Sequence, residues 1–355
     1  IENSLKLLKY GGQLSFILDI TFFETAFVDI RKYIVKNYYI NSLTTGLQEF
    51  EGVASGQLII DITNVKMFNN NIKLIDFATK EIKLVNQYTW NNEENKYKFN
   101  EPLNEIQQTI NSKIIKYEGL EKFFPKKALR TCCALTGKTE EFIVNPTEEN
   151  NCIVFPYIEG AKGLKGKFFT PTPNRHIKYD YELQLKLSDK FKHELEALGI
   201  KNKKRVTLGD KDAYLAPKIF IRQSATEIIA TYCSEPYAAN NSIYILTTKE
   251  NTPESIDMLK YTCGLLNSDL ITFYCRINKI IRAEKGKTPQ IKISDLKNIK
   301  INVSDKFFKQ IIDLVERLLL NPENKYLYKR LNSLVYEIYN INEQEQKFIA
   351  EYLIT

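Results

Sequence analysis

One stretch of the chain, residues 216–298, constrains the fold most because it alternates apolar runs of core-strand length with polar turns. Three of these runs are rich in β-branched and aromatic residues, which is typical of buried strands. They span residues 217–223, 228–232 and 241–246. A helical pattern with residues 264–268 at its centre follows, and then a basic loop over residues 276–287. This order predicts a mixed α/β module that carries a cationic loop.

The N-terminal part of the chain alternates helical and strand patterns. Helices are predicted over residues 2–9 and 22–36, and strands over residues 13–18, 38–44 and 57–62. This alternation is typical of the tail of a doubly wound α/β sheet. Because a loop without a helix joins the last two strands, we expect them to be antiparallel neighbours.

The rest of the chain suggests further elements and boundaries. Weak strands are predicted near residues 73–77 and 82–85, a helix over 102–117, a tight turn feeding a strand over 135–144, and helices over 306–320 and 327–339. Asn342 is the expected N-cap of a last helix, with Glu345 at the capping-box position. The polar segment 91–98 is the best domain boundary. We expect domains at residues 1–90, 91–117 (a linker helix), 118–303 and 304–355.

Composition excludes several functional classes. The six cysteines form no C-x-x-C pair and the chain has two histidines, so we expect no metal site. Reduced cysteines indicate a cytoplasmic protein. No apolar run approaches the roughly 20 residues of a membrane span, and no signal peptide is recognisable. The first residue is Ile, which suggests a fragment or a processed product.

Positive charge is concentrated in two segments. The net charge is +7. Residues 161–206 hold twelve Lys or Arg and five Asp or Glu, and residues 276–292 hold six basic residues and one acid. A single charged run is usually a solvated face, but two runs flanking one strand-rich core favour a surface that follows phosphates. Residues 136–139 superficially match the end of a P-loop, yet Cys132 stands where its first glycine belongs.

Several segments, taken in order, carry a family resemblance. They are residues 7–18, 135–144, 155–160, 218–222, 241–244, 264–268, 289–291 and the tail from Val335. Together they resemble N6-adenine DNA methyltransferases of type II (IIG-like) restriction–modification systems. The later segments are similar to their TaqI-like C-terminal specificity domain. The resemblance implies the tail of a Rossmann-like methyltransferase sheet, followed by an α+β target recognition domain and C-terminal helices.

Such enzymes transfer a methyl group from S-adenosylmethionine to a flipped adenine. The Asn-Pro-Pro-Tyr motif and the glycine-bearing cofactor loop of the family are absent from these 355 residues. We therefore expect no catalytic residue in this chain, and S-adenosylmethionine in the full-length enzyme rather than on this chain alone. The expected partners are double-stranded DNA and the missing N-terminal methyltransferase half, with no membrane.

The candidate site residues follow from both arguments. In the family, the loop that holds Phe50 places an aromatic ring against the flipped adenine, so the resemblance implies base stacking, with plain packing as the alternative. Arg222 and Arg282 are candidates for base or backbone contacts. The expected phosphate ligands are Lys162, Lys165, Lys167, Arg175, Lys285 and Lys287. The expected DNA-facing turn is Thr136, Gly137 and Lys138.

Two other functions remain open. The chain could be a non-catalytic specificity or interaction subunit that binds DNA or a partner protein. An enzyme half should expose a sheet edge and an apolar face, whereas a self-standing module should cover them. A small-molecule α/β enzyme is the weakest alternative because the sequence offers no catalytic dyad.

Overall fold

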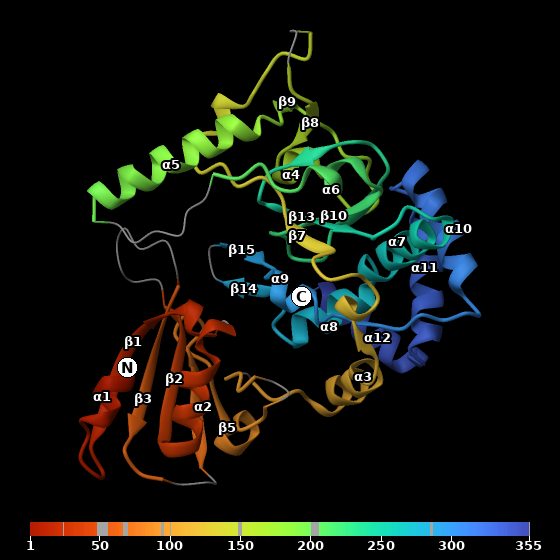
Figure 1. The fold of residues 1–355 in the computed structure, drawn as a ribbon. Helices are drawn as coiled ribbons and strands as arrows, with labels where there is room; N and C mark the ends of the chain where they lie inside the picture. The colour runs from red at the N-terminus through yellow and green to blue at the C-terminus, as the bar shows by residue number, and fades with distance from the viewer. Residues whose placement is uncertain are drawn as a thin grey trace. The chain divides into compact units, whose positions relative to one another are not determined.

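The computed structural model describes residues 1–23, 25–47, 56–66, 70–93, 96–99, 101–147, 151–199, 206–284 and 287–354. The chain forms two compact units (Figure 1). Unit 1 comprises residues 1–105 with 284–287, and unit 2 comprises residues 106–283 with 288–355. The boundary falls at the start of helix α3 (Glu105–Ile115), within the segment expected to be a linker.

Unit 1 is built on a mixed five-stranded sheet with the order β1-β3-β2-β4-β5. Its strands are β1 (Gln13–Asp19), β2 (Tyr39–Leu47), β3 (Gln57–Thr63), β4 (Asn71–Asp76) and β5 (Ile82–Asn86). Strands β2 and β3 pair antiparallel, as predicted. Strands β2 and β4 form the parallel pair. That this sheet is the tail of a Rossmann-like domain stays a prediction.

The helices of unit 1 are shorter than the sequence pattern predicts. They are α1 (Glu2–Lys6) and α2 (Val28–Asn37), with 3-10 turns at Ile20–Phe23, Thr25–Phe27 and Gln87–Trp90. The helix expected from residue 22 begins at Val28, and the 3-10 turns Ile20–Phe23 and Thr25–Phe27 precede it. The Arg31 Nη1 donates to the Phe22 carbonyl at 2.6 Å.

A buried arginine completes the core of unit 1. Arg31 is 1% exposed, and its Nε and Nη2 atoms donate to the carbonyls of Tyr97 and Lys96. Beside it, the rings of Trp90 and Phe99 stack with centroids 4.5 Å apart. Because every donor aimed at a carbonyl offsets part of the cost of burying the charge, this arginine ties residues 96–99 to α2.

Unit 2 contains an antiparallel four-stranded sheet with the order β11-β10-β13-β7. Its strands are β7 (Leu129–Thr131), β10 (Lys218–Arg222), β11 (Ala230–Cys233) and β13 (Ile243–Thr247). A three-stranded sheet joins β8 (Val154–Ile158), β9 (Arg175–Lys178) and β12 (Ala238–Ala239). Two strand pairs remain: β14 (Arg282–Glu284) with β15 (Lys287–Gln290), and β6 (Glu118–Gly119) with β16 (Lys300–Ile301).

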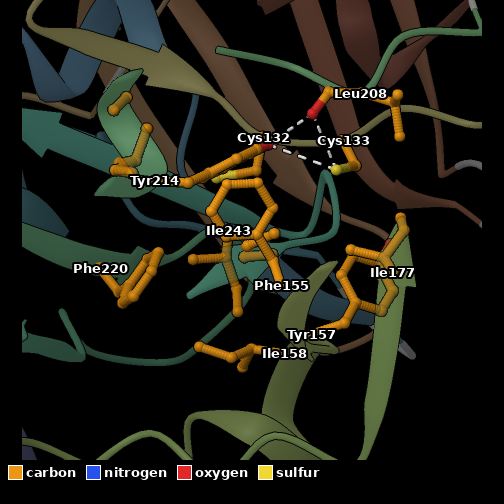
Figure 2. Packing of buried hydrophobic residues seen from close by; sticks show 14 of the residues in the cluster. Cys132, Cys133, Phe155, Tyr157, Ile158, Ile177, Leu208, Tyr214, Phe220 and Ile243 are labelled. Atoms are coloured by element: carbon orange, nitrogen blue, oxygen red, sulfur yellow. Dashed lines mark hydrogen bonds between the residues drawn. The ribbon is translucent and has the colours of Figure 1, made fainter. Parts of the chain in front are cut away.

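The two larger sheets of unit 2 enclose one core (Figure 2). The Cys133 thiol and the Tyr214 hydroxyl both donate to the Leu208 carbonyl, at 3.0 and 2.9 Å. Burial raises the pKa of the Cys133 thiol to about 12. All six cysteines are unbridged thiols, as expected. Phe142 is fully buried in this core. The strand expected up to residue 144 is reduced to one bridge, Ile143 with Ile177, because residues 139–141 form a 3-10 turn.

Helices surround the sheets of unit 2 (Figure 1). Besides α3 they are α4 (Gly160–Gly163), α5 (Tyr181–Ala197), α6 (Lys211–Leu215), α7 (Pro253–Leu266), α8 (Asp269–Ile277), α9 (Ile293–Leu296), α10 (Phe308–Leu320), α11 (Lys325–Ile338) and α12 (Glu343–Ile354). The 3-10 turns are Leu120–Lys122 and Thr139–Glu141. In the part of the chain that the structure describes, no helix combines the length and apolarity that crossing a membrane requires.

Two sequence predictions about these helices have opposite outcomes. Residues 264–268 are not the centre of a helix but the junction of α7 and α8, because the Ser268 hydroxyl caps α8 by accepting from the Ile271 N–H. The capping box of α12 is confirmed: Asn342 accepts from the Glu345 N–H at 2.9 Å, and Glu345 accepts from the Asn342 N–H at 2.8 Å.

Candidate nucleic-acid interface

One end of the four-stranded sheet gathers several loops. Arg222, the last residue of β10, lies opposite Ile243, the first residue of β13. Thr131, the last residue of β7, lies opposite Tyr244. The loops that follow β7 and β10 and the loop that precedes β13 therefore leave the sheet at the same end. Of the predicted DNA-contacting residues, Arg222 borders the loop that follows β10, and Thr136, Gly137 and Lys138 lie in the segment that follows β7.

Main-chain hydrogen bonds join several loop segments side by side at this end of the sheet. The Gln223 N–H donates to the Ser242 carbonyl at 2.8 Å, and the Ile291 N–H donates to the Gln223 carbonyl at 2.8 Å. The Ala225 N–H donates to the Pro289 carbonyl at 3.0 Å. We name residues 160–165, 223–226, 240–242 and 289–291 the loop shelf.

The segment 160–165 of the loop shelf is held by Asn240. Its N–H donates to the Ile158 carbonyl at 3.0 Å, and its Oδ1 accepts from the Gly160 N–H at 3.3 Å. Gly160 has φ +51°, and an added Cβ would lie 3.2 Å from the Ser242 hydroxyl. Glycine therefore lets α4 begin directly beside the segment that precedes β13.

Arg175 links the loop shelf to the predicted DNA-facing turn. Its Nη1 lies 2.6 Å from Glu140 Oε1, and its Nε lies 3.4 Å from Glu159 Oε2. Glu140 comes two residues after Lys138, and Glu159 immediately precedes α4. The Glu140 hydrogen bond is the main cause that raises the pKa of Arg175. This arginine thus has two carboxylate partners, and its role as a phosphate ligand stays a prediction.

The turn at residues 136–138 has the conformation expected of an exposed loop tip. Thr136 and Gly137 both have positive φ, at 24° and 74°. The Lys138 N–H closes the turn on the Leu135 carbonyl at 2.7 Å. Gly137 is exposed, and open space surrounds the position where a Cβ would stand. The backbone is therefore accessible to a large ligand here.

The three lysines at 162–167 differ in their surroundings. Lys162 and Lys165 are exposed, and no hydrogen bond or ion pair joins either to another described residue. Lys167 is 14% exposed, and its Nζ lies 2.6 Å from Glu227 and 2.7 Å from the Tyr328 hydroxyl. The chain therefore presents two available ammonium groups on the loop shelf and uses the third as an anchor.

The anchor belongs to a buried polar network. The Tyr328 hydroxyl lies 2.8 Å from the Asn267 carbonyl and 2.8 Å from Asp269 Oδ1. Asn332 donates to the other Asp269 oxygen at 2.9 Å. Burial, reinforced by the Asp269 carboxylate, raises the pKa of Tyr328. The network fixes Lys167 to the junction of α7 and α8.

The structure describes three of the other predicted contact residues, and two lie outside the described ranges. Arg222 is half-buried at the edge of the loop shelf, its Nη2 donates to the Ser224 carbonyl at 3.1 Å, and burial lowers its pKa. Arg282 and Lys287 are described as members of β14 and β15. Phe50 and Lys285 lie outside the described residues. No group of three or more His, Cys, Asp or Glu within the described ranges is arranged to hold a metal.

Sequence reasoning missed the amide-rich part of the loop shelf. Asn240, Asn241 and Ser242 immediately precede β13, a strand that is buried throughout. This abrupt change from polar to apolar residues was a usable signal, because a polar run at the end of a core strand marks a loop at the sheet end.

One span of the chain is similar to a known specificity domain. Residues 177–301, which include β10, β11, β13, α7 and α8, match the family model of the TaqI-like C-terminal specificity domain. This span is similar to a TaqI-like specificity domain. It contains three of the four segments of the loop shelf. No curated protein sequence matches the chain.

One solved structure extends the likeness in fold to nearly the whole chain. The type IIL restriction–modification enzyme MmeI, solved in complex with DNA, matches with a TM-score of 0.54 and 13% identity, over 96% of this chain and 49% of MmeI. The type IIG restriction endonuclease BpuSI matches with a TM-score of 0.36 and 11% identity, over 96% of this chain and 49% of BpuSI. The chain spans about half the length of these enzymes. At this identity the likeness to MmeI concerns the fold.

Proposed function

We propose that this chain is the DNA-binding, target-recognition portion of a site-specific DNA-modifying enzyme. The observation that carries the proposal is the loop shelf, whose segments 223–226, 240–242 and 289–291 all lie within the span that matches a TaqI-like specificity domain. Loops placed side by side on a rigid sheet are the usual support for binding residues.

The distribution of charge supports a duplex as the ligand. Phosphate contacts supply affinity without sequence information, and contacts to base edges supply the choice of sequence. Lys162 and Lys165 provide exposed, unpaired ammonium groups for the first task. For the second, Arg222 ends β10 at the same end of the sheet from which the chain leaves β7 toward the turn at residues 136–138.

For the whole protein we propose adenine-N6 methylation within a restriction–modification system, with S-adenosylmethionine as the methyl donor. The sequence resemblance supports this reaction. Because the Asn-Pro-Pro-Tyr motif and the glycine-bearing cofactor loop are absent from these 355 residues, the proposal assigns no methyl-transfer step to this chain. Base stacking by Phe50 belongs to the same proposal.

One observation separates this proposal from a self-standing interaction module. Among the described strands, β1 lies at an edge of its sheet. Ile17 on that strand is 51% exposed, and Ile82 and Leu84 on the other edge strand, β5, are more exposed still. A module complete in itself should cover such edges, so these exposed edges favour the enzyme portion.

Salt dependence of DNA binding tests the proposal. We expect Lys162→Ala/Lys165→Ala to weaken binding to duplex DNA and to reduce the slope of log K against log salt by about two, because each lost phosphate contact removes about 0.9. Fluorescence anisotropy at several salt concentrations measures both quantities.

A matched variant controls for the loss of charge. Lys306→Ala/Lys309→Ala removes two positive charges from exposed positions, one just before α10 and one in its first turn. We expect this variant to keep the wild-type slope. Equal slopes for the wild type and the Lys162→Ala/Lys165→Ala variant would show that the loop shelf does not contact phosphates.

A further inference from the structure

Two adjacent asparagines of the loop shelf, Asn240 and Asn241, differ in the hydrogen bonding of their side chains. The Asn240 side chain is occupied, because its Oδ1 accepts from the main-chain N–H groups of Gly160 and Ser242, each at 3.3 Å. The Asn241 side chain is exposed and makes no hydrogen bond to any described residue. One amide therefore builds the loop shelf while the next remains available on its surface.

A second available amide lies on another segment of the loop shelf. Pro289 and Ile291 are buried, whereas Gln290 between them is exposed. This alternation is that of an extended strand, in which successive side chains point to opposite faces. Gln290 bridges to Ser224 through its main chain, and its amide makes no hydrogen bond to the described residues.

Gln223 joins the two segments that carry these amides. Its N–H donates to the Ser242 carbonyl, and its carbonyl accepts from the Ile291 N–H. The segments that carry Asn241 and Gln290 are each hydrogen-bonded to Gln223, so they lie at most two strand spacings apart, which is roughly 10 Å. This separation corresponds to about three base pairs along a duplex that rises by about 3.4 Å per pair.

The chemistry of these side chains matches that of base edges. An Asn or Gln amide both donates and accepts, so it can form two hydrogen bonds with the N6 and N7 atoms of adenine. An arginine pairs in the same way with the O6 and N7 atoms of guanine. Amides that are exposed and unpaired lose few existing hydrogen bonds when they engage a base.

We propose that Asn241 and Gln290 are specificity-determining residues that recognise base pairs, with a preference for adenine, at positions within about three base pairs of one another. The inference rests on the proposed function and extends it from DNA binding to sequence choice. Lys162 and Lys165 set the position of the phosphate backbone, and the two amides discriminate between bases.

Selection from a pool of randomised duplex DNA tests the inference. The complete 355-residue chain and the variants Asn241→Ala and Gln290→Ala are each used to capture duplexes, which are then sequenced. We expect the wild type to enrich one motif. Each variant should keep most of that motif and lose about 5- to 150-fold of discrimination at a single position. The two affected positions should differ and lie within about three base pairs.

Control variants separate recognition from folding. Gln310→Ala removes an exposed amide from α10 and should leave the enriched motif unchanged. Asn241→Asp and Gln290→Glu keep the side-chain shape but only accept hydrogen bonds, so each should shift the preference at its position toward cytosine, which offers an N4 donor. Circular dichroism melts show that each variant is folded before its motif is read.

The outcomes distinguish failure of the inference from failure of the proposed function. If the wild type enriches no duplex, the proposed function is wrong and the inference with it. If the wild type enriches a motif that all four amide variants reproduce, DNA recognition stands and the assignment of Asn241 and Gln290 is wrong. A loss spread evenly over every position also overturns the assignment, because it indicates general affinity.

Discussion

At the scale of single residues, Lys218 in β10 shows how burial changes the chemistry of a cation. The residue is fully buried, and its Nζ donates to the Glu235 carbonyl at 2.5 Å. Burial lowers its pKa from 10.5 to about 8. Four residues later in the same strand, Arg222 is half-buried at the sheet end. The sequence pattern singled out Arg222 as a DNA contact, but it did not predict that the Lys218 side chain is buried.

The low pKa of Lys218 predicts a change of stability with pH. Between pH 8 and 10.5 the unfolded chain binds a proton that the folded chain has released, so the free energy of unfolding rises with pH. The rise due to this residue is at most about 3 kcal/mol. The variant Lys218→Met has no ionisable group at this position, so it lacks this rise in the free energy of unfolding. We therefore expect the variant to be most stable relative to the wild type below pH 8 and to lose that advantage toward pH 10.5.

Urea unfolding at intervals from pH 7 to 10.5 measures this difference. Lys309→Met, at an exposed position on α10, is the matched control and should differ from the wild type by an amount that does not vary with pH. A pH-independent difference for Lys218→Met would mean that the Lys218 ammonium is not destabilised by burial.

At the scale of elements, the approach of α7 to α10 depends on Gly264. An added Cβ there would lie 2.9 Å from Cγ2 of Ile311 and 2.9 Å from Cγ2 of Val315. Distances this short require both branched side chains to move. The sequence indicated a helix around Gly264, but its partner helix lies more than 40 residues later, and a local pattern does not identify such a contact.

Gly264→Ala should therefore destabilise the protein although alanine favours helices. Overpacking a well-filled interface costs about 1–3 kcal/mol, which outweighs the roughly 1 kcal/mol that alanine contributes over glycine in a helix. Chemical denaturation measures the net change. Ser333→Ala, at an exposed position of α11, should be neutral or slightly stabilising. A more stable Gly264→Ala variant would show that α7 and α10 can move apart at little cost.

At the scale of the whole molecule, the chain has separate hydrophobic cores. One is formed entirely by residues of unit 1, including Ile60, and another entirely by residues of unit 2, including Phe220. We expect calorimetry to resolve two unfolding transitions. Ile60→Ala should lower the melting temperature of one transition and Phe220→Ala that of the other. Each substitution should destabilise its own unit by about 2–5 kcal/mol. Both substitutions lowering a single shared transition would show that the units unfold cooperatively.

Sequence reasoning was most successful for strands such as β10 and β13, because their apolar runs are buried on both sides. The runs near β10, β11 and β13 were predicted, and so was the antiparallel pairing of β2 with β3. The candidate site was predicted less completely. Spacing of charges pointed to Lys162 and Lys165, but it could not show that the neighbouring Lys167 is bound by Glu227 and Tyr328. Those partners lie 60 and 161 residues away along the chain.

The way the loop shelf is joined has a consequence for how such a protein can evolve. Most of its cross-links are made by peptide groups, which every amino acid except proline supplies. Exchanging the side chain at position 241 or 290 therefore leaves the supporting framework intact. Under the proposed function, a lineage can acquire a new target sequence through single point mutations, and each intermediate along the way remains a folded protein.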